Sequence, residues 1–404
     1  MFYKILKISA AIVTVFVLVA ISAIFVFQTI LPEKYYSGST EKLFYSSSYG
    51  KIISFEPNPA ETRTVINIQK DSFSAKAKLL GIFPVKSVSV SVTDEKIVTV
   101  CGTPFGVKMF TDGVLIVGFS KIKTEKGSLC PAVESGLLEG DVIKSIDGTE
   151  VFTNENVAEI IENSGGKTLE ISVLRDGENT SVDLTPEMLE DENVYKAGFW
   201  VRDSTAGIGT LTFYDPENLS FAGLGHAVCD VDTGKVIPFS SGEIVAASIT
   251  KIKKGISGSP GELGGVFSGN KNLGTVKINN ETGLYGTLEY ELDGINLPIA
   301  HKQDIYEGPA VVLSTIDGNE AKEYDIIIEK ISLSDSSLTK NMVIKVVDEE
   351  LIELTGGIVQ GMSGSPIIQN EKLVGAVTHV FVNDPTKGYA IFAENMLEMS
   401  KKCN

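Results

Sequence analysis

The sequence predicts a multidomain exported protein with an N-terminal transmembrane helix, a small α+β domain and a mostly-β C-terminal domain. Three observations favour this fold class: an apolar N-terminal run, a central region that mixes strand and helix periods, and a C-terminal half rich in short strands separated by glycine. A chain of 404 residues that is 43% hydrophobic is long enough for two or three packed domains. We expect segments over residues 1–33, 34–100, 101–190 and 191–404.

Residues 1–33 predict a signal-anchor. Lys4 and Lys7 precede an apolar run from Ile8 to Phe27, which is long enough to cross a bilayer as a helix. Because the lysines stand before the run and no cluster follows it, the N-terminus should lie in the cytoplasm and the rest outside. A cleaved signal peptide is the alternative, since Ala20-Ile21-Ser22 resembles a small-x-small cleavage site. Either interpretation exports the remainder of the chain.

Residues 34–100 should form a membrane-proximal segment with strands. The part from 34 to about 70 is polar and contains a serine run and two prolines, which favours a tether. Further on, Val88, Val90 and Val92 alternate with serines, a pattern typical of a half-buried strand.

Composition argues against two classes of function. The net charge of −17 repels phosphate backbones, so we expect no nucleic-acid partner. The four cysteines form no CxxC pair and the three histidines form no HExxH motif, so we expect neither a metal site nor a cofactor.

Residues 101–190 combine a buried strand at 113–119, a Gly-Asp-Val-Ile run at 140–143, an Ile-Asp-Gly turn at 146–148 and a helix. Together these runs resemble a PDZ domain. Such domains add an extended peptide to a sheet edge and hold its carboxylate with backbone amides. The resemblance places the peptide-binding loop at Phe105, Gly106 and Val107, where Val107 departs from the usual phenylalanine. The alternative is a packing module of the same fold that binds no free peptide.

The strongest chemical signal is the hexapeptide Gly-Met-Ser-Gly-Ser-Pro at 361–366, followed by a strand, a turn and a second strand. Small residues beside a serine allow backbone amides to point at a developing oxyanion. The run resembles the nucleophile hairpin of chymotrypsin-like peptidases, which implies a double β-barrel over residues 191–404. By that resemblance Ser363 is the nucleophile, the amides of Gly361 and Ser363 form the oxyanion hole, and Thr378, His379 and Val380 line the substrate cleft. Met362 stands where that family has aspartate, which argues against zymogen-style activation.

A near copy of this hexapeptide, at 255–260, makes Ser257 a rival nucleophile. Two related barrels would account for the duplication. We prefer Ser363, because the glycine-rich run after Ser257 does not continue as a long strand.

The base and the acid are less strongly marked. His226 lies in a turn of small residues, which suits a side chain presented at a cleft, whereas His301 resembles a surface strand end. Asp348, at a strand end before the nucleophile loop, is the expected orienting acid. Asp230 and Asp232 are the alternatives.

Long runs at 78–85, 200–212, 223–227 and 355–366 resemble, in order, the stage IV sporulation protein B (SpoIVB) serine peptidases. The resemblance implies an enzyme, a serine endopeptidase anchored to the forespore inner membrane and facing the intermembrane space. It implies self-cleavage, with the PDZ domain taking part in self-recognition, and cleavage of a membrane-bound inhibitor of an intramembrane metalloprotease. That cleavage triggers late sigma-factor activation during sporulation. The family's catalytic residues fall on His226, Asp348 and Ser363. The alternatives are a non-catalytic PDZ adaptor and a quality-control protease, whose domains stand in the reverse order.

Overall fold

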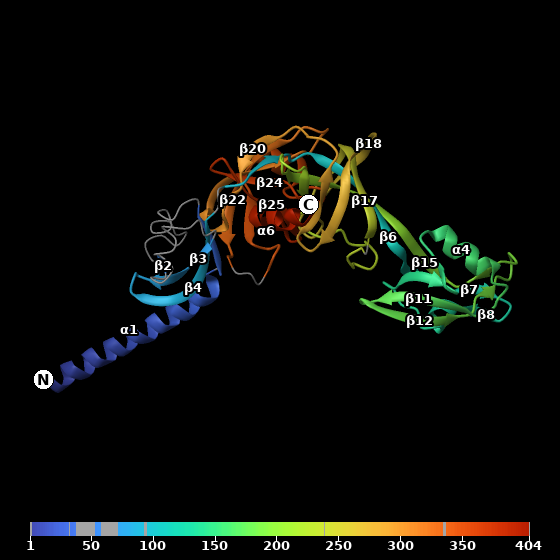
Figure 1. The fold of residues 1–404 in the computed structure, drawn as a ribbon, viewed down its shortest axis with the longest axis horizontal. Helices are drawn as coiled ribbons and strands as arrows, with labels where there is room; N and C mark the ends of the chain where they lie inside the picture. Colours follow the sequence, from blue (N-terminus) through green and yellow to red (C-terminus); the bar gives the residue numbers. More distant parts are fainter. Residues whose placement is uncertain are drawn as a thin grey trace.

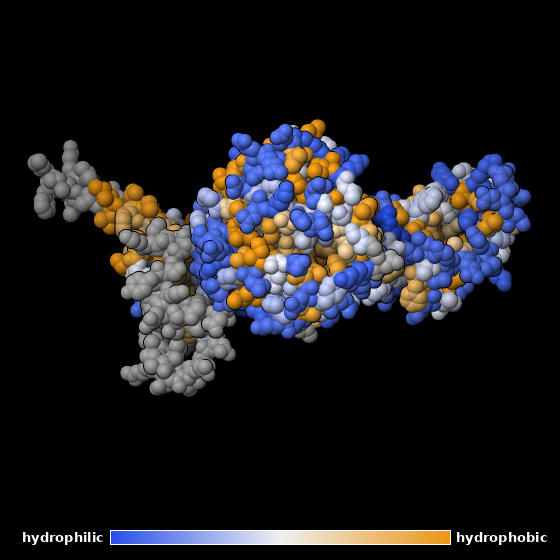
Figure 2. Space-filling view, turned by 90° about the horizontal axis from the view of Figure 1, so that it is seen from above, coloured by the Kyte–Doolittle hydropathy of each residue, from blue (hydrophilic) through white to orange (hydrophobic). Residues whose placement is uncertain are grey.

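The N-terminal helix α1 (Phe2–Ile30) projects away from the rest of the protein (Figure 1). The computed structural model describes residues 2–31, 33–37, 53–57, 72–92, 95–237, 239–333 and 337–403. Within α1, Ile12–Thr29 has a mean hydropathy of 2.5, and by length and composition it could cross a membrane. Its apolar side chains are exposed along the helix (Figure 2), as expected of a segment that has no protein core to cover it.

A four-stranded sheet follows α1 and packs against its end through Leu31. The expected alternation is confirmed at Val88 and Val90, which are buried, whereas Ser87 and Ser89 are exposed. The tether predicted for residues 34 to about 70 lies largely outside the described residues. In spatial order the strands are β1 (Lys34–Ser37), β4 (Phe83–Val92), β3 (Ser72–Leu79) and β2 (Ile53–Pro57).

The first barrel is a ring of six antiparallel strands that closes because β6 pairs with both β15 and β17. Its core contains Phe105, Met109 and Phe221. Two short strands, β5 (Ile97–Val100) and β20 (Ile295–Pro298), flank it. Around the ring the strands are β6 (Pro104–Phe119), β17 (Phe239–Lys253), β18 (Glu262–Asn280), β19 (Gly283–Leu288), β16 (Ser220–Gly223) and β15 (Phe199–Tyr214).

The α+β domain is inserted into this barrel, because β6 and β15 both run out of the barrel and continue side by side in the domain (Figure 1). A bulge at Asp203 interrupts the pairing of β6 with β15. There the hydroxyl of Thr111 donates to the carbonyl of Asp203 at 2.9 Å. The elements between them are β7 (Ile122–Thr124), β8 (Gly127–Leu129), α3 (Pro131–Glu134), β9 (Val142–Ile146), β10 (Thr149–Glu150), α4 (Asn154–Asn163), β11 (Leu169–Arg175), β12 (Glu178–Leu184), β13 (Glu187–Met188) and β14 (Tyr195–Lys196).

This insertion corrects the expected peptide-binding loop. Phe105, Gly106 and Val107 pair with β15 on one side and β17 on the other, so their backbone has no edge to offer. Phe105 and Val107 are buried in the barrel core. Strand pairing therefore places Phe105, Gly106 and Val107 in the first barrel, whereas the boundary expected at residue 101 would place them in the α+β domain.

The second barrel is closed by six strands, so the double-barrel architecture is confirmed. Ile328, Ile344 and Ile367 lie in its core. The strands, in ring order, are β21 (Gly308–Ser314), β22 (Lys322–Ile331), β23 (Met342–Val346), β26 (Asp384–Phe392), β25 (Lys372–Phe381) and β24 (Pro366–Gln369). Short helices accompany it: η3 (Lys302–Asp304), α5 (Glu349–Thr355), α6 (Ala393–Ser400) and η4 (Lys401–Cys403).

Candidate active site

Ser363 lies in a tight loop between α5 and β24, where the two barrels meet. The loop is held by strand β15 of the first barrel: the amide of Thr210 donates to the carbonyl of Ser363 at 3.1 Å, and its hydroxyl donates to that of Gly361 at 2.9 Å. Thr212 donates in the same way to Gly364 at 2.7 Å. The nucleophile loop of one barrel is thus fixed by a strand of the other.

The backbone amides of the loop divide into two groups. Those of Met362, Gly364 and Ser365 donate to backbone carbonyls. Those of Gly361 and Ser363 have no hydrogen-bond acceptor within the described chain. Gly361 has a φ of +97°, in the region that favours glycine. Two free amides, that of the serine itself and that of the residue two positions before it, are what an oxyanion hole requires.

Met362 anchors this loop, since its side chain is 0% exposed and belongs to the core of the second barrel. Met362→Ala should therefore lower the free energy of unfolding by about 2–5 kcal/mol, through lost burial and the cavity left behind. Chemical denaturation of the variant measures this. Met362→Leu, which nearly conserves volume, should lose less than about 1.5 kcal/mol. Equal stability of the alanine variant and the parent would contradict the anchoring role.

His226 comes from the turn after β16, which crosses to the second barrel. Leu224 and Gly225 both have positive φ, of 66° and 71°. A Cβ at Gly225 would lie 2.9 Å from the methyl group of Thr378, and one at Gly364 would lie 2.5 Å from the amide of Leu224. Glycine at both positions lets the histidine turn and the nucleophile loop touch.

The imidazole of His226 is oriented by its own chain. Nδ1 lies 2.8 Å from the carbonyl oxygen of Ala227, which can only accept, so Nδ1 carries the proton and Nε2 remains available as a base. Burial lowers the pKa of His226 below its ordinary value, against a smaller opposing effect of this hydrogen bond. The ring is therefore neutral at pH 7, as a general base must be.

Thr378 contacts Ser363, and its neighbour His379 lies beside His226. The Ser363 hydroxyl donates to the carbonyl of Thr378 at 3.0 Å, and the ring of His379 lies 5.3 Å from that of His226, centroid to centroid. Burial, with a smaller effect of His226, lowers the pKa of His379 to about 4. Val380, the third predicted cleft residue, is half-buried next along β25. The structure thus brings together His226, Ser363 and the residues predicted to line the cleft.

Asp348 is not brought to His226. It is the N-cap of α5: one carboxylate oxygen accepts the amide of Leu351 at 2.9 Å and the other that of Asp325 at 3.3 Å. The expectation that Asp348 orients the histidine is corrected here, because both its oxygens are engaged by backbone on the second barrel. The carbonyl of Ala227 occupies the orienting position instead.

Asp348→Asn tests this correction. Asparagine is as good an N-cap as aspartate, so stability should change by less than about 1 kcal/mol and the proteolytic rate by no more than a few-fold. An orienting acid would cost roughly 10⁴ in rate when converted to its amide. A loss of that size in the hydrolysis rate would restore Asp348 to the site.

The alternative acids, Asp230 and Asp232, bind Arg202 instead of the histidine. Arg202 donates to the buried carboxylate of Asp230 and, at 2.7 Å, to that of Asp232. Burial acts to raise the pKa of Asp230, but hydrogen bonds from Thr233 and Arg202 outweigh it and lower this pKa. Sequence reasoning missed Arg202, because nothing local marks a residue whose partners lie so far along the chain.

The rival residues occupy structural positions. Ser257 lies at the turn between β17 and β18, where its hydroxyl donates to the carbonyl of Asn383 at 2.9 Å. The ring of His301 stacks on Tyr36, and its Nδ1 lies 3.5 Å from a carboxylate oxygen of Glu394. Cys101, Cys130, Cys229 and Cys403 are all free thiols.

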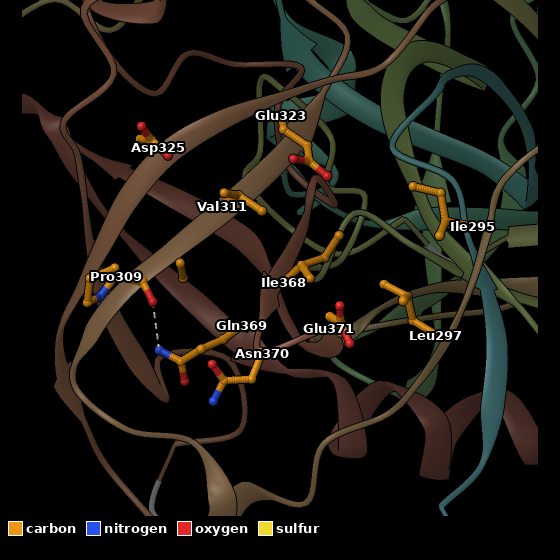
Figure 3. A pocket seen from close by; sticks show the side chains of 11 residues that line it. Ile295, Leu297, Pro309, Val311, Glu323, Asp325, Ile368, Gln369, Asn370 and Glu371 are labelled. Atoms are coloured by element: carbon orange, nitrogen blue, oxygen red, sulfur yellow. Dashed lines mark hydrogen bonds between the residues drawn. The ribbon is translucent and has the colours of Figure 1, made fainter.

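A pocket of about 410 Å³ lies on the second barrel beside β20 (Figure 3). Apolar Ile295, Leu297 and Ile368 line it together with acidic Glu323 and Glu371, and neither Ser363 nor a histidine does. Within the described residues, no group of three or more histidine, cysteine or acidic side chains could hold a metal ion.

Comparison with known proteins identifies both parts of the chain. A PDZ domain model matches residues 107–185. The chain is 28% identical over 109 residues to a candidate zinc metalloprotease of Mesorhizobium japonicum, and 34% identical over 62 residues to the Regulator of sigma-W protease RasP of Bacillus subtilis. These matches cover 26% and 15% of this chain, and only 29% and 15% of the relatives.

Among solved structures, the PDZ domain of an SdrC-like protein from Listeria monocytogenes is 22% identical, with a TM-score of 0.19. The match covers 22% of this chain and 87% of that domain. The model of the SpoIVB peptidase S55 family matches residues 193–397, half of the 404 residues, and includes His226 and Ser363. The chain contains a PDZ domain and belongs to the SpoIVB peptidase S55 family.

Proposed function

We propose that this protein is a serine endopeptidase that acts outside the cytoplasmic membrane, cleaves itself, and cuts a membrane-bound regulator to trigger late sigma-factor activation during spore formation. The observation that carries the catalytic part is the pair of unengaged amides, of Gly361 and Ser363, around a serine that lies beside the histidine turn. Such amides stabilise the tetrahedral intermediate of acyl transfer, which is the largest catalytic contribution expected here.

The reaction proceeds in two halves. The hydroxyl of Ser363 rotates from the carbonyl of Thr378 towards His226, whose Nε2 takes its proton as Oγ attacks the scissile carbonyl. The oxyanion is held by the two free amides while His226 returns the proton to the leaving amine. Water, deprotonated by the same nitrogen, then hydrolyses the acyl-enzyme. The hydrogen bond from Nδ1 to Ala227 keeps the ring oriented throughout.

The substrate and the place of action rest on the anchor and on the family. The apolar helix Ile12–Thr29 would hold the peptidase close to a membrane surface, with the lysines before it in the cytoplasm. A peptidase held there meets membrane-bound proteins at high effective concentration. The sporulation role, at the forespore inner membrane, follows from the likeness to SpoIVB peptidases.

A fluorophosphonate probe tests the peptidase directly on the full chain in detergent. Attack by Ser363 expels fluoride and leaves a phosphonylated serine, which peptide mapping by mass spectrometry locates. We expect labelling at Ser363 and arrest of self-cleavage in the same sample. Labelling at Ser257, or self-cleavage that continues after complete labelling of Ser363, would reject this site. An unlabelled chain that does not cleave itself would favour the non-catalytic adaptor.

A further inference from the structure

Two of the three histidines of the chain lie together at the candidate active site. His226 belongs to the turn after β16 of the first barrel, and His379 lies on β25 of the second barrel. Their ring centroids are 5.3 Å apart, and the ring planes are tilted by 42°. The proposed mechanism takes a proton with His226 alone, so His379 is a second imidazole that has no part in the proton transfer.

Packing between the two barrels fixes this spacing. The histidine turn lies so close to β25 that a Cβ at Gly225 would lie 2.9 Å from the methyl group of Thr378, the residue before His379. Within the second barrel, His379 pairs with Tyr389 of β26. The two rings are thus presented by backbones that are held in place before any ligand arrives, which favours the binding of one ion by both.

The separation of the rings agrees with that of two ligands on one tetrahedral ion. Zinc–nitrogen bonds of about 2.1 Å place the centres of two imidazoles roughly 5.3 Å apart at the tetrahedral angle. The right angle of octahedral or square-planar coordination would bring the two centres to roughly 4.6 Å. The measured 5.3 Å therefore favours zinc over metals that require a right angle.

Both rings can offer a nitrogen lone pair. Nδ1 of His226 lies 2.8 Å from the carbonyl oxygen of Ala227, which leaves Nε2 for a metal. A histidine that ligates a metal almost always donates its other ring N–H to such an outer partner, which fixes the tautomer and the ring orientation. Part of His379 reaches the surface. The pKa of each ring is lowered, so both are neutral at pH 7, the form that ligates metals.

The surrounding charges indicate a site of moderate affinity. Besides burial and His226, Lys340 helps to lower the pKa of His379, and the same positive charge opposes a bound cation. Among the residues that the structure describes, no acidic or cysteine side chain completes a group of three with the two histidines. Water would fill the other coordination positions, so the ion should come and go with its free concentration.

We propose that His226 and His379 together bind a zinc ion, which inhibits the peptidase reversibly. The ion takes the lone pair of His226 Nε2 that must otherwise accept the proton of Ser363, so acyl transfer stops until the ion leaves. The inhibition rests on the proposed peptidase function, whereas the binding of zinc does not.

Binding is measured by isothermal titration calorimetry of zinc chloride into the full-length Ser363→Ala chain in detergent. We expect one saturable site, which is lost when His226→Ala or His379→Gln is added. His379→Cys should retain it, because a thiolate also ligates zinc, whereas a purely structural role would not favour cysteine over glutamine. Cys229→Ser, which removes an exposed thiol, should bind like the parent. No binding, binding that survives both histidine substitutions, or binding lost in Cys229→Ser overturns the site.

Inhibition is measured as the rate of fluorophosphonate labelling of Ser363 at graded free zinc, each variant against its own metal-free rate. We expect saturating zinc to slow the parent by roughly 100-fold or more, the usual contribution of a general base, and EDTA to reverse this. In His379→Gln the half-inhibiting concentration should rise by about tenfold or more, since even an outer partner of a zinc site contributes about 10–100-fold in affinity. His301→Ala, which removes the third histidine, should respond like the parent. An unslowed parent, or an undiminished response in His379→Gln, overturns the inhibition.

Failure of this site is distinguishable from failure of the proposed peptidase. If Ser363 is never labelled, with or without zinc, the peptidase function fails, and the calorimetry in Ser363→Ala still decides whether zinc binds. If only His379→Gln is unlabelled, the titration of the doubly substituted chain decides whether that histidine is a ligand.

Discussion

Replacing Ser363 by alanine should abolish proteolysis and leave the fold intact. The serine is half-buried, its hydroxyl makes a single hydrogen bond, to Thr378, and alanine fits the same space. Without the nucleophile only the oxyanion hole and substrate binding remain, so the rate should fall by roughly 10⁴ to 10⁶. Following the mass of the purified full chain over time, parent against variant, measures this loss.

Ser257→Ala is the matched control, since it removes the same hydroxyl from a nearly identical hexapeptide. It should cleave itself at the parent's rate. Fragments that accumulate equally in the Ser363→Ala chain, and disappear in Ser257→Ala, would transfer the nucleophile to the turn between β17 and β18.

Replacing His226 by alanine should cost a similar factor, because the proposed mechanism uses its Nε2 to take the proton from Ser363. The parent's pH profile should report the same residue. Protonation of Nε2 removes the base, and burial lowers the pKa of His226. Activity should therefore persist below pH 6.5, about the ordinary histidine value, and fall only at more acidic pH.

His301→Ala provides the control for this prediction, as that ring stacks on Tyr36 and faces Glu394. It should leave both the rate and the pH profile unchanged. A parent profile with its acidic limb centred above pH 7 would contradict a buried, neutral His226.

The candidate pair of Ser363 and His226 could be proposed from sequence because its signals are local. Ser363 and His226 stand in short runs of glycine and other small residues, and few structures other than tight turns at a cleft need such runs. The double barrel followed from the hairpin after Ser363 and from many short strands. Neither inference required knowledge of which strands pair.

The errors concern residues whose local sequence is compatible with more than one role. Phe105–Val107 alternates like any half-buried strand, and only its pairing with β15 and β17 places it in the barrel. Asp348 follows strand β23 but also precedes Glu349 and Glu350, and acidic residues in a first turn favour an N-cap. Tertiary pairing decided the first case and a local helix cap the second.

The insertion of the PDZ domain between β6 and β15 also has a consequence for how the chain folds. The part of β6 in the first barrel and the part of β15 that pairs with it there are separated by roughly 90 residues of sequence. Bringing these two segments together costs about 4 kcal/mol in chain entropy. The inserted domain has its own core and more local contacts, so it should fold earlier. Once folded, it holds the ends of both strands at the bulge between Thr111 and Asp203. The domain would then act as a template for barrel closure, and variants that unfold it should slow barrel formation before they affect the peptidase chemistry.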